Sequence, residues 1–159
     1  SDLDSCSIVL GYQSDKVADV IKDLNINLIL NPLWKEGQAS SLKAALNSLT
    51  SSYSDLLIML GDLPGIRSGH INRIIEEHLS SENRSSKITI PSFKGETGNP
   101  VIWGKSFFHD LSNLEGDVGG RVLFGQHPAA INLIEMDDPS VVTDTDTPED
   151  FYDFLANRT

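Results

Sequence analysis

Hydrophobic residues along the chain follow two spacings, short continuous runs and a wider pattern of every third or fourth position. Continuous runs are typical of buried strands, and the wider spacing is typical of amphipathic helices. The clearest run is Leu-Leu-Ile-Met-Leu at residues 56–60, which Gly61 and Asp62 follow directly. Because the whole run is apolar, we expect a strand buried on both faces, as in the centre of a parallel sheet.

Similar runs predict further strands at residues 7–10, 26–30, 88–91, 101–103 and 131–136. Helical spacing predicts helices that begin near Ser14, Ser40, Ser68 and Thr147, with short ones near residues 107–111 and 122–124. The apolar faces of the first and last helices are expected to pack onto the core. These faces are formed by Val17, Val20, Ile21 and Leu24, and by Phe151, Phe154 and Leu155.

Predicted strands alternate with predicted helices over nearly the whole chain. Such alternation favours the α/β class, as a three-layer α/β/α sandwich with a mostly parallel sheet. No internal repeat, low-complexity segment or long linker divides the sequence. We therefore expect one domain over residues 1–159.

Charge and cysteine content narrow the possible functions of the 159-residue chain. Its formal net charge is −11 and its pI is about 4.6, so nucleic-acid binding, which needs Lys and Arg, is excluded. A phosphorylated small molecule remains compatible where a metal offsets the charge. Cys6 is the only cysteine, which excludes an internal disulfide. No apolar run reaches membrane-span length and no signal peptide is visible, so we expect a cytoplasmic protein that binds no membrane.

Two acidic sites could hold a divalent cation. Asp62 follows a predicted strand, and ligands of open α/β sheets bind beyond the carboxyl ends of strands. Asp144 and Asp146 would point to the same side of an extended segment. The alternative for Asp62 is that it only makes a turn. The alternative for Asp146 is that its charge only complements the N-terminus of the following helix, for which Thr147 is the predicted N-cap and Pro148 the first residue.

Three loops could contact a ligand. The first contains Gly37, Ser40 and Ser41 and lies where a strand leads into a helix. Its backbone and hydroxyl groups could form hydrogen bonds to a base, ribose or phosphate. The alternative for Ser40 is that it is only an N-cap. The loop at residues 95–100 could be a simple turn. The glycine-rich loop at residues 114–121 could close over a substrate, with its arginine facing an anionic group.

Taken in order, five motifs resemble the MobA/MocA-like nucleotidyltransferases, the molybdenum cofactor cytidylyltransferases and guanylyltransferases. They are Asn-Pro-Leu-Trp-Lys-Glu-Gly at 31–37 with Ser-Ser-Leu at 40–42, Gly-Asp-Leu-Pro at 61–64, Gly-Asn-Pro-Val at 98–101, Gly-Asp-Val-Gly at 116–119 and Asp-Thr-Asp-Thr-Pro-Glu-Asp at 144–150. The first and fourth motifs look more like the cytidylyltransferase branch.

The resemblance implies a Rossmann-like nucleotidyltransferase fold and a Mg²⁺-dependent reaction. A CMP or GMP group would pass from CTP or GTP to the phosphate of molybdopterin, a pterin-type acceptor, with release of pyrophosphate. The expected protein partner is a molybdoenzyme or its chaperone. Such a reaction relies on positioning and metal ions rather than a protein nucleophile, and the sequence contains no obvious catalytic Ser, Cys or His.

The resemblance also implies the roles of single residues. Asp62 matches the family's metal-binding aspartate, and Asp144 or Asp146 matches the second acidic site, so these three are the expected catalytic and metal-binding residues. The expected nucleotide-binding residues are Gly37, Ser40, Ser41 and Gly61. The expected acceptor-binding residues are Asn99, Pro100, Asp117 and Arg121.

One feature departs from the family, which opens with a strand and a glycine-rich loop that holds the triphosphate. The first predicted strand, at residues 7–10, resembles the family's second strand, and the chain starts at Ser1 rather than Met. We therefore expect an N-terminally incomplete domain, with unpaired backbone groups and a gap in the core. This polypeptide alone is expected to have no useful transferase activity.

Two alternative functions follow from the same residues. The first is the same chemistry on a sugar phosphate or another phosphorylated acceptor. The second is a degenerate domain that binds a nucleotide or a partner without catalysis. The absence of the glycine-rich loop favours the degenerate domain. Asp62, Asp144 and Asp146 disfavour it, because a pure binding module needs no metal site.

Overall fold

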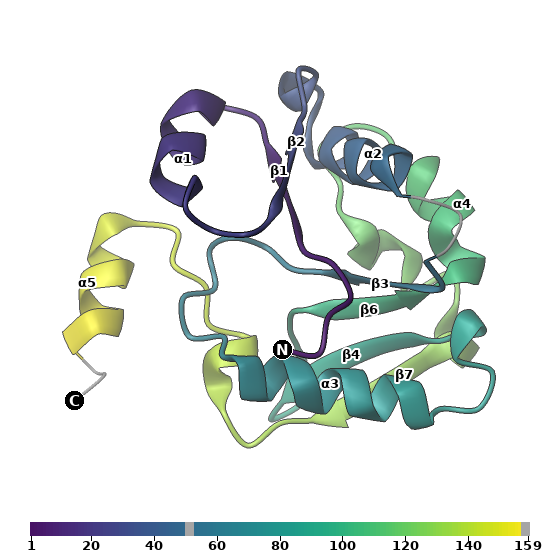
Figure 1. Ribbon diagram of the computed structural model, residues 1–159. Helices are drawn as coiled ribbons and strands as arrows, with labels where there is room; N and C mark the ends of the chain where they lie inside the picture. Colours follow the sequence, from purple (N-terminus) through teal and green to yellow (C-terminus); the bar gives the residue numbers. More distant parts are fainter. Residues whose placement is uncertain (50–52, 157–159) are drawn as a thin grey trace. The chain divides into compact units, whose positions relative to one another are not determined.

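The computed structural model describes residues 1–49 and 53–156 (Figure 1). Its strands are β1 (Ser7–Leu10), β2 (Asn27–Leu30), β3 (Asp55–Ile58), β4 (Ile88–Phe93), β5 (Glu96–Thr97), β6 (Val101–Gly104) and β7 (Ile131–Glu135). Its α-helices are α1 (Ser14–Ile21), α2 (Gln38–Ser48), α3 (Ser68–Ser80), α4 (Phe108–Ser112) and α5 (Pro148–Ala156). Strands and helices alternate along the chain, so the α/β class is confirmed. None of the helices in the described part of the chain has the length and hydrophobicity needed to cross a membrane.

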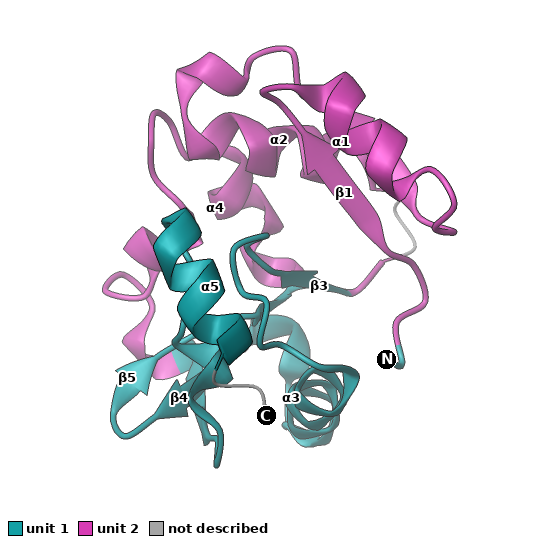
Figure 2. Cartoon of the chain, turned by 90° about the vertical axis from the view of Figure 1, so that its left-hand side faces the viewer, with its two compact units in different colours: residues 1–2, 55–104, 130–159 teal, residues 3–54, 105–129 magenta. Residues whose placement is uncertain are grey.

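The chain divides into two compact units, coloured separately in Figure 2. Unit 1 comprises residues 1–2, 55–104 and 130–159, and unit 2 comprises residues 3–54 and 105–129. Each unit is built from segments that lie far apart in the sequence. The single domain over residues 1–159 stays a prediction.

Unit 1 contains a mixed five-stranded sheet. Its strands follow the order β3, β6, β4, β5, and β7 pairs with β4. β6 runs antiparallel to β3 and β4, and β5 runs antiparallel to β4, whereas β4 and β7 are parallel. The prediction of a mostly parallel sheet is therefore wrong for this unit, because the chain reverses after β4 and returns as β6 between two strands of the opposite direction.

The prediction of a doubly buried central strand at residues 56–60 is also wrong. β3 is the end strand of its sheet and pairs with β6 alone among the described strands. Its side chains are half-buried, and Met59 and Leu60, which follow it, are 45% and 37% exposed. An apolar run indicates that a strand is hydrophobic. It does not indicate which strands lie beside it, because strand order depends on pairing between segments that are distant in the sequence. The expected gap in the core stays a prediction.

The core of unit 1 lies between α3 and the sheet, where Figure 1 shows the helix alongside β4 and β7. Ile74 of α3 is fully buried in one cluster with Ile102 of β6 and Ile134 of β7. Met136 and Val141 belong to the same cluster. Burying each such side chain contributes roughly 1.5 to 3 kcal/mol. This core fixes the segments that lead to the predicted acidic sites.

Unit 2 contains the parallel pair β1–β2, together with α1, α2 and α4. α2 buries Ala39 and Leu42. α1 forms where predicted, but Val17 and Val20 are 40% and 83% exposed, and Leu24 lies outside the helix and is 58% exposed. The predicted burial of this face is therefore wrong, because spacing makes a helix amphipathic but only a packed neighbour covers its apolar side.

α5 begins at Pro148, as the sequence predicts. The backbone N–H of Thr147 donates to Asp150 Oδ2 at 2.8 Å, and the N–H of Asp150 donates to Thr147 Oγ1 at 3.1 Å. This reciprocal pair is a local capping interaction. The expected packing of the helix is wrong for Phe151 and Leu155, which are 43% and 46% exposed.

Candidate functional site

Asp62, the first predicted site residue, follows the end of β3 in unit 1. Its Oδ1 atom is buried and has no hydrogen-bond partner among the described residues. An unpaired buried acceptor costs roughly 1 to 3 kcal/mol, and a charged one costs more. Buried polar atoms without a partner are rare and commonly mark the place of an ion, a water or a ligand. The environment of Asp62 therefore suits a bound cation.

Thr145 joins the second acidic segment to Asp62. Its backbone N–H and its Oγ1 hydroxyl both donate to the carbonyl oxygen of Asp62, at 2.9 and 3.1 Å. Thr145 is half-buried, whereas Asp144 and Asp146 on either side of it are exposed, which is the alternation of an extended chain. The fold thus brings the segment of both carboxylates next to Asp62. Sequence reasoning missed Thr145 because its role is a long-range backbone contact.

These aspartates do not form a closed metal cage. Within residues 1–49 and 53–156, no group of three or more His, Cys, Asp or Glu side chains could hold a metal ion. Mg²⁺ does not require such a group, since one or two carboxylates bind it together with water and phosphate oxygens. Asp62 with Asp144 or Asp146 is a donor set of that kind.

A cavity of about 420 Å³ opens beside this segment in unit 1. Its lining combines apolar and polar surface and carries three carboxylates and one arginine. The lining residues are Gly65, Arg67, Pro139, Ser140, Thr143, Asp144, Thr145, Asp150, Asp153 and Phe154. Hydrogen bonds from the side chain and backbone of Thr147 hold the pKa of Asp150 below its ordinary value of 3.8. The cavity is therefore negatively charged at neutral pH and suits a cation, or phosphates accompanied by one.

The other predicted residues of unit 1 lie in two loops. A Cβ at Gly61 would meet no atom within 4 Å, so the fold itself does not require glycine there. The backbone N–H of Asn99 donates to the carbonyl oxygen of Val141 at 2.8 Å, and Pro100 is buried. A Cβ at Gly98 would collide with the same Val141 oxygen. This loop is therefore packed closely on Val141, and its acceptor-binding role stays a prediction.

In unit 2, two glycine motifs far apart in the sequence interlock. Gly37 has a φ of 98°, and a Cβ there would lie 2.5 Å from Asp117 N and from the carbonyl carbon of Gly116. Asp117 Oδ1 accepts from Gln38 N at 3.1 Å, and Gly116 O accepts from Ala39 N at 3.2 Å. These bonds satisfy two N–H groups at the start of α2 that a ligand could otherwise use. Because a Cβ at position 37 would collide with the loop at residues 116–117, glycine is required there. Asp117 caps the helix.

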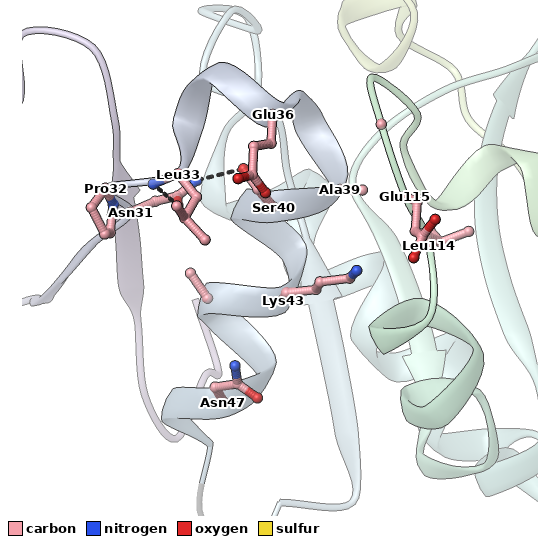
Figure 3. Close-up of a pocket in the computed structure, with 12 residues that line it drawn as sticks. Asn31, Pro32, Leu33, Glu36, Ala39, Ser40, Lys43, Asn47, Leu114 and Glu115 are labelled. Atoms are coloured by element: carbon pink, nitrogen blue, oxygen red, sulfur yellow. Dashed lines mark hydrogen bonds between the residues drawn. The ribbon is translucent and has the colours of Figure 1, made fainter.

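Ser40 and Ser41 are held by Asn31, the residue that follows β2. Asn31 is 2% exposed, and its Nδ2 donates to Ser40 Oγ at 2.8 Å and to Ser41 Oγ at 3.1 Å. Figure 3 shows the first of these bonds and a second bond, in which Asn31 Oδ1 accepts from Leu33 N. Sequence reasoning used Asn31 only as the end of a strand and as part of a motif. A polar residue at a strand end is a weak signal, because its burial depends on tertiary packing.

A second cavity, of about 470 Å³, lies within unit 2 (Figure 3). Its lining residues are Asn31, Pro32, Leu33, Glu36, Ala39, Ser40, Lys43, Ala44, Asn47, Leu114, Glu115 and Gly116. Lys43 extends from α2 toward the loop that carries Glu115. The cavity is large enough for a small ligand, and its lining includes the amide of Asn47 and the charged side chains of Glu36, Lys43 and Glu115.

The two units divide the predicted site residues between them. Unit 1 holds the three metal-site aspartates, Gly61 and the Asn99–Pro100 pair. Unit 2 holds Gly37, Ser40, Ser41, Asp117 and Arg121, the last of them exposed in the 3-10 helix Gly120–Leu123. Carboxylates suited to a cation therefore belong to unit 1, and hydroxyl and amide groups suited to a nucleobase or ribose belong to unit 2.

The family model of the MobA-like NTP transferase domain matches residues 2–131. That range includes Gly37, both serines, Asp62 and the loop at 116–119. The chain belongs to this family. The resemblance drawn from the five motifs is therefore confirmed, and family membership supports a nucleotidyltransferase. The last motif, at residues 144–150, lies beyond the matched range.

Two curated relatives and one solved structure define the similarity further. The chain is 24% identical over 147 residues to the Molybdenum cofactor cytidylyltransferase of Escherichia coli, covering 91% of this chain and 70% of that protein. It is 22% identical over 108 residues to the Bifunctional protein GlmU of Prochlorococcus marinus, covering 68% of this chain and 23% of that protein. The chain thus spans less than a quarter of the length of GlmU.

The solved structure is that of a Mycobacterium tuberculosis protein in complex with manganese. It matches with a TM-score of 0.78 at 22% identity, covering 97% of this chain and 78% of that chain. At this identity the similarity concerns the fold alone, and it agrees with the fold that family membership implies.

Proposed function

We propose that the protein is a Mg²⁺-dependent nucleotidyltransferase that transfers CMP, or GMP, from the corresponding NTP to the phosphate of a molybdopterin-type acceptor. The proposal is carried by the buried Oδ1 of Asp62, which has no hydrogen-bond partner among the described residues, in a chain of the MobA-like NTP transferase family. The cytidylyltransferase relative, aligned over 91% of this chain, supports the choice of acceptor and of CTP. The expected protein partner is a molybdoenzyme or its chaperone.

The proposed metal ligands are Asp62 and one or both of Asp144 and Asp146. A bound cation would neutralise charge at the α-phosphate and at the pyrophosphate leaving group. Thr145 holds the backbone of the acidic segment against the Asp62 backbone through two hydrogen bonds, which supports joint use of these carboxylates. The manganese complex of a protein with the same fold supports a divalent cation as the cofactor.

The reaction itself needs no protein nucleophile. An oxygen of the acceptor phosphate forms a bond to the α-phosphorus of the NTP, and the bond from that phosphorus to the bridging oxygen breaks. Pyrophosphate leaves with the electron pair, so the reaction is redox-neutral. The task of the protein is to position the two phosphates and to stabilise their charge.

We assign nucleotide contacts to Gly37, Ser40, Ser41 and Gly61, and acceptor contacts to Asn99, Pro100, Asp117 and Arg121. The fixed geometry at the start of α2 supports the assignment of Gly37, Ser40 and Ser41, because a braced segment loses little entropy when it binds a ligand. For Asp117 the helix cap uses Oδ1, which leaves Oδ2 to serve the acceptor.

The acceptor has a second candidate, a sugar phosphate or another phosphorylated molecule. The chain also matches GlmU, a relative whose name differs from that of the molybdenum cofactor cytidylyltransferase, and this match supports the second candidate. A non-catalytic nucleotide-binding domain is disfavoured, since it gives no reason for a buried carboxylate oxygen without a partner.

Isothermal titration of CTP and of GTP, each with Mg²⁺, into the natural full-length protein tests the proposal. We expect binding of one nucleotide in preference to the other, and a loss of at least tenfold in affinity for Asp62→Ala, since its cation contact is charged. Asp137→Ala is the matched control, because this aspartate is exposed and pairs with Arg73 on the surface of unit 1. A transfer assay with molybdopterin and a sugar phosphate then identifies the acceptor. Absence of nucleotide binding, or equal losses for the two variants, would refute the proposal.

A further inference from the structure

Asn31 is a buried residue whose side-chain amide nitrogen and oxygen are both hydrogen-bonded within unit 2. Its backbone N–H donates to Leu10 O at 2.8 Å, and its side-chain Oδ1 accepts from Leu33 N at 3.0 Å. These two bonds fix the side chain so that Nδ2 faces α2. With 2% of its surface exposed, Asn31 cannot itself contact a ligand of appreciable size.

The two serines that accept from Asn31 differ in what they have left to offer. Ser40 Oγ donates its single hydrogen to Gly37 O at 2.8 Å while it accepts from Asn31. Ser41 Oγ also accepts from Asn31, but its hydroxyl hydrogen meets no acceptor in the described part of the chain. A hydroxyl has one hydrogen to donate, so only Ser41 can still donate to a ligand. Ser41 is half-buried and so remains accessible.

We propose that Asn31 is a positioning residue of the nucleotide site, which directs the hydroxyl hydrogen of Ser41 outward to an acceptor atom of the nucleotide's base or ribose. The inference rests on the proposed function and refines it, because it assigns ligand contact to Ser41 and a bracing role to Ser40. An amide N–H can only donate a hydrogen bond, so the hydroxyl oxygen that it contacts must accept. The hydrogen of that hydroxyl then points away from the amide and can be donated to another group.

Asn31→Asp reverses this direction with little change in shape. An ionised carboxylate still accepts from Leu33 N, but it has no hydrogen to give to the serines. The hydroxyl of Ser41 then turns inward to donate to the new carboxylate and is withdrawn from the ligand. A purely structural role of Asn31 predicts a loss of stability instead, with no connection to Ser41.

The test is a double-mutant cycle in the natural full-length protein, read by isothermal titration of CTP with Mg²⁺. We expect Ser41→Ala and Asn31→Asp each to weaken binding about 3- to 10-fold, the range of one neutral hydrogen bond. The double variant should bind no more weakly than the weaker single variant. Asn25→Asp is the matched control, since it makes the same change at an exposed residue of unit 2.

Additive losses in the cycle would overturn the inference while leaving the proposed function intact. Complete absence of nucleotide binding by the wild-type protein would refute the proposed function and this inference with it. If Asn31→Asp does not fold, a comparison of Ser41→Ala with Ser40→Ala decides the matter. The inference requires the larger loss of affinity from Ser41→Ala, and an equal or larger loss from Ser40→Ala would overturn it.

Discussion

Two aspartates near β3, one at its start and one beyond its end, have opposite surroundings. Asp55, its first residue, accepts from His78 Nε2 at 3.0 Å and lies 3.3 Å from Arg84 Nε. His78 is 1% exposed, and its other ring nitrogen lies 2.8 Å from Thr89 Oγ1. Asp62, which follows the end of the strand, has a buried oxygen with no partner among the described residues.

The difference separates a structural carboxylate from a candidate functional one. Buried polar groups that serve only the fold are almost always paired, because an unpaired one opposes folding. The Asp55 network fulfils that rule and needs no ligand to explain it. Asp62 violates the rule, and a bound cation would remove the violation. The same residue type therefore has one role at the start of β3 and another beyond its end, and the partners of each side chain distinguish them.

The largest expected effect of this difference is on stability. Asp55→Ala leaves a buried ring nitrogen of His78 without its acceptor, so we expect a loss of about 3 kcal/mol in the free energy of unfolding. Asp62→Ala removes an unpaired atom, and we expect no loss in the absence of metal. Urea denaturation of both variants measures the contrast. Asp55→Asn retains an acceptor for His78 and should lose less, whereas equal losses at positions 55 and 62 would contradict the comparison.

A second effect concerns the cation. Mn²⁺ or Mg²⁺ at ten times its dissociation constant should stabilise the wild-type protein by about 1.4 kcal/mol, because only the folded state binds it. Thermal unfolding with and without EDTA measures the corresponding change in Tm. Asp62→Asn should abolish the change, and Asp137→Asn, at an exposed surface pair, should retain it. An unaltered response in Asp62→Asn would place the cation elsewhere.

The smallest effect concerns Asp150, an exposed carboxylate whose pKa is lowered by hydrogen bonds from Thr147. Since the pKa is lower in the folded state, the ionised form contributes stability above the unfolded value of 3.8. That contribution is lost as the pH falls through the folded-state pKa. Thr147→Ala should therefore be less stable than wild type at neutral pH, and the difference should shrink below pH 3.8. Urea denaturation from pH 7 to pH 3 measures it, and a constant difference would contradict the assignment.

Local features of the fold were predictable from the sequence alone. The start of α5 follows from Thr147, Pro148 and Asp150, which interact within one helical turn. The alternation of strands and helices follows from the spacing of apolar residues. The order of the five motifs along the chain is enough to identify the family. In each case the interactions join residues close in sequence, or the information lies in the residues themselves.

The tertiary structure decided which of these residues have partners. The sequence does not show that β3 ends its sheet, that the face of α1 is exposed, or that the segment at Gly37 packs on a loop 79 residues away. Nor does it show that the buried amide of Asn31 donates to two serines, or that a buried oxygen of Asp62 has no hydrogen-bond partner in the described part of the chain. Burial and pairing depend on contacts between distant segments, so the sequence by itself determined the local structure and the family. Only the folded chain determined which polar groups are satisfied and which remain for a ligand.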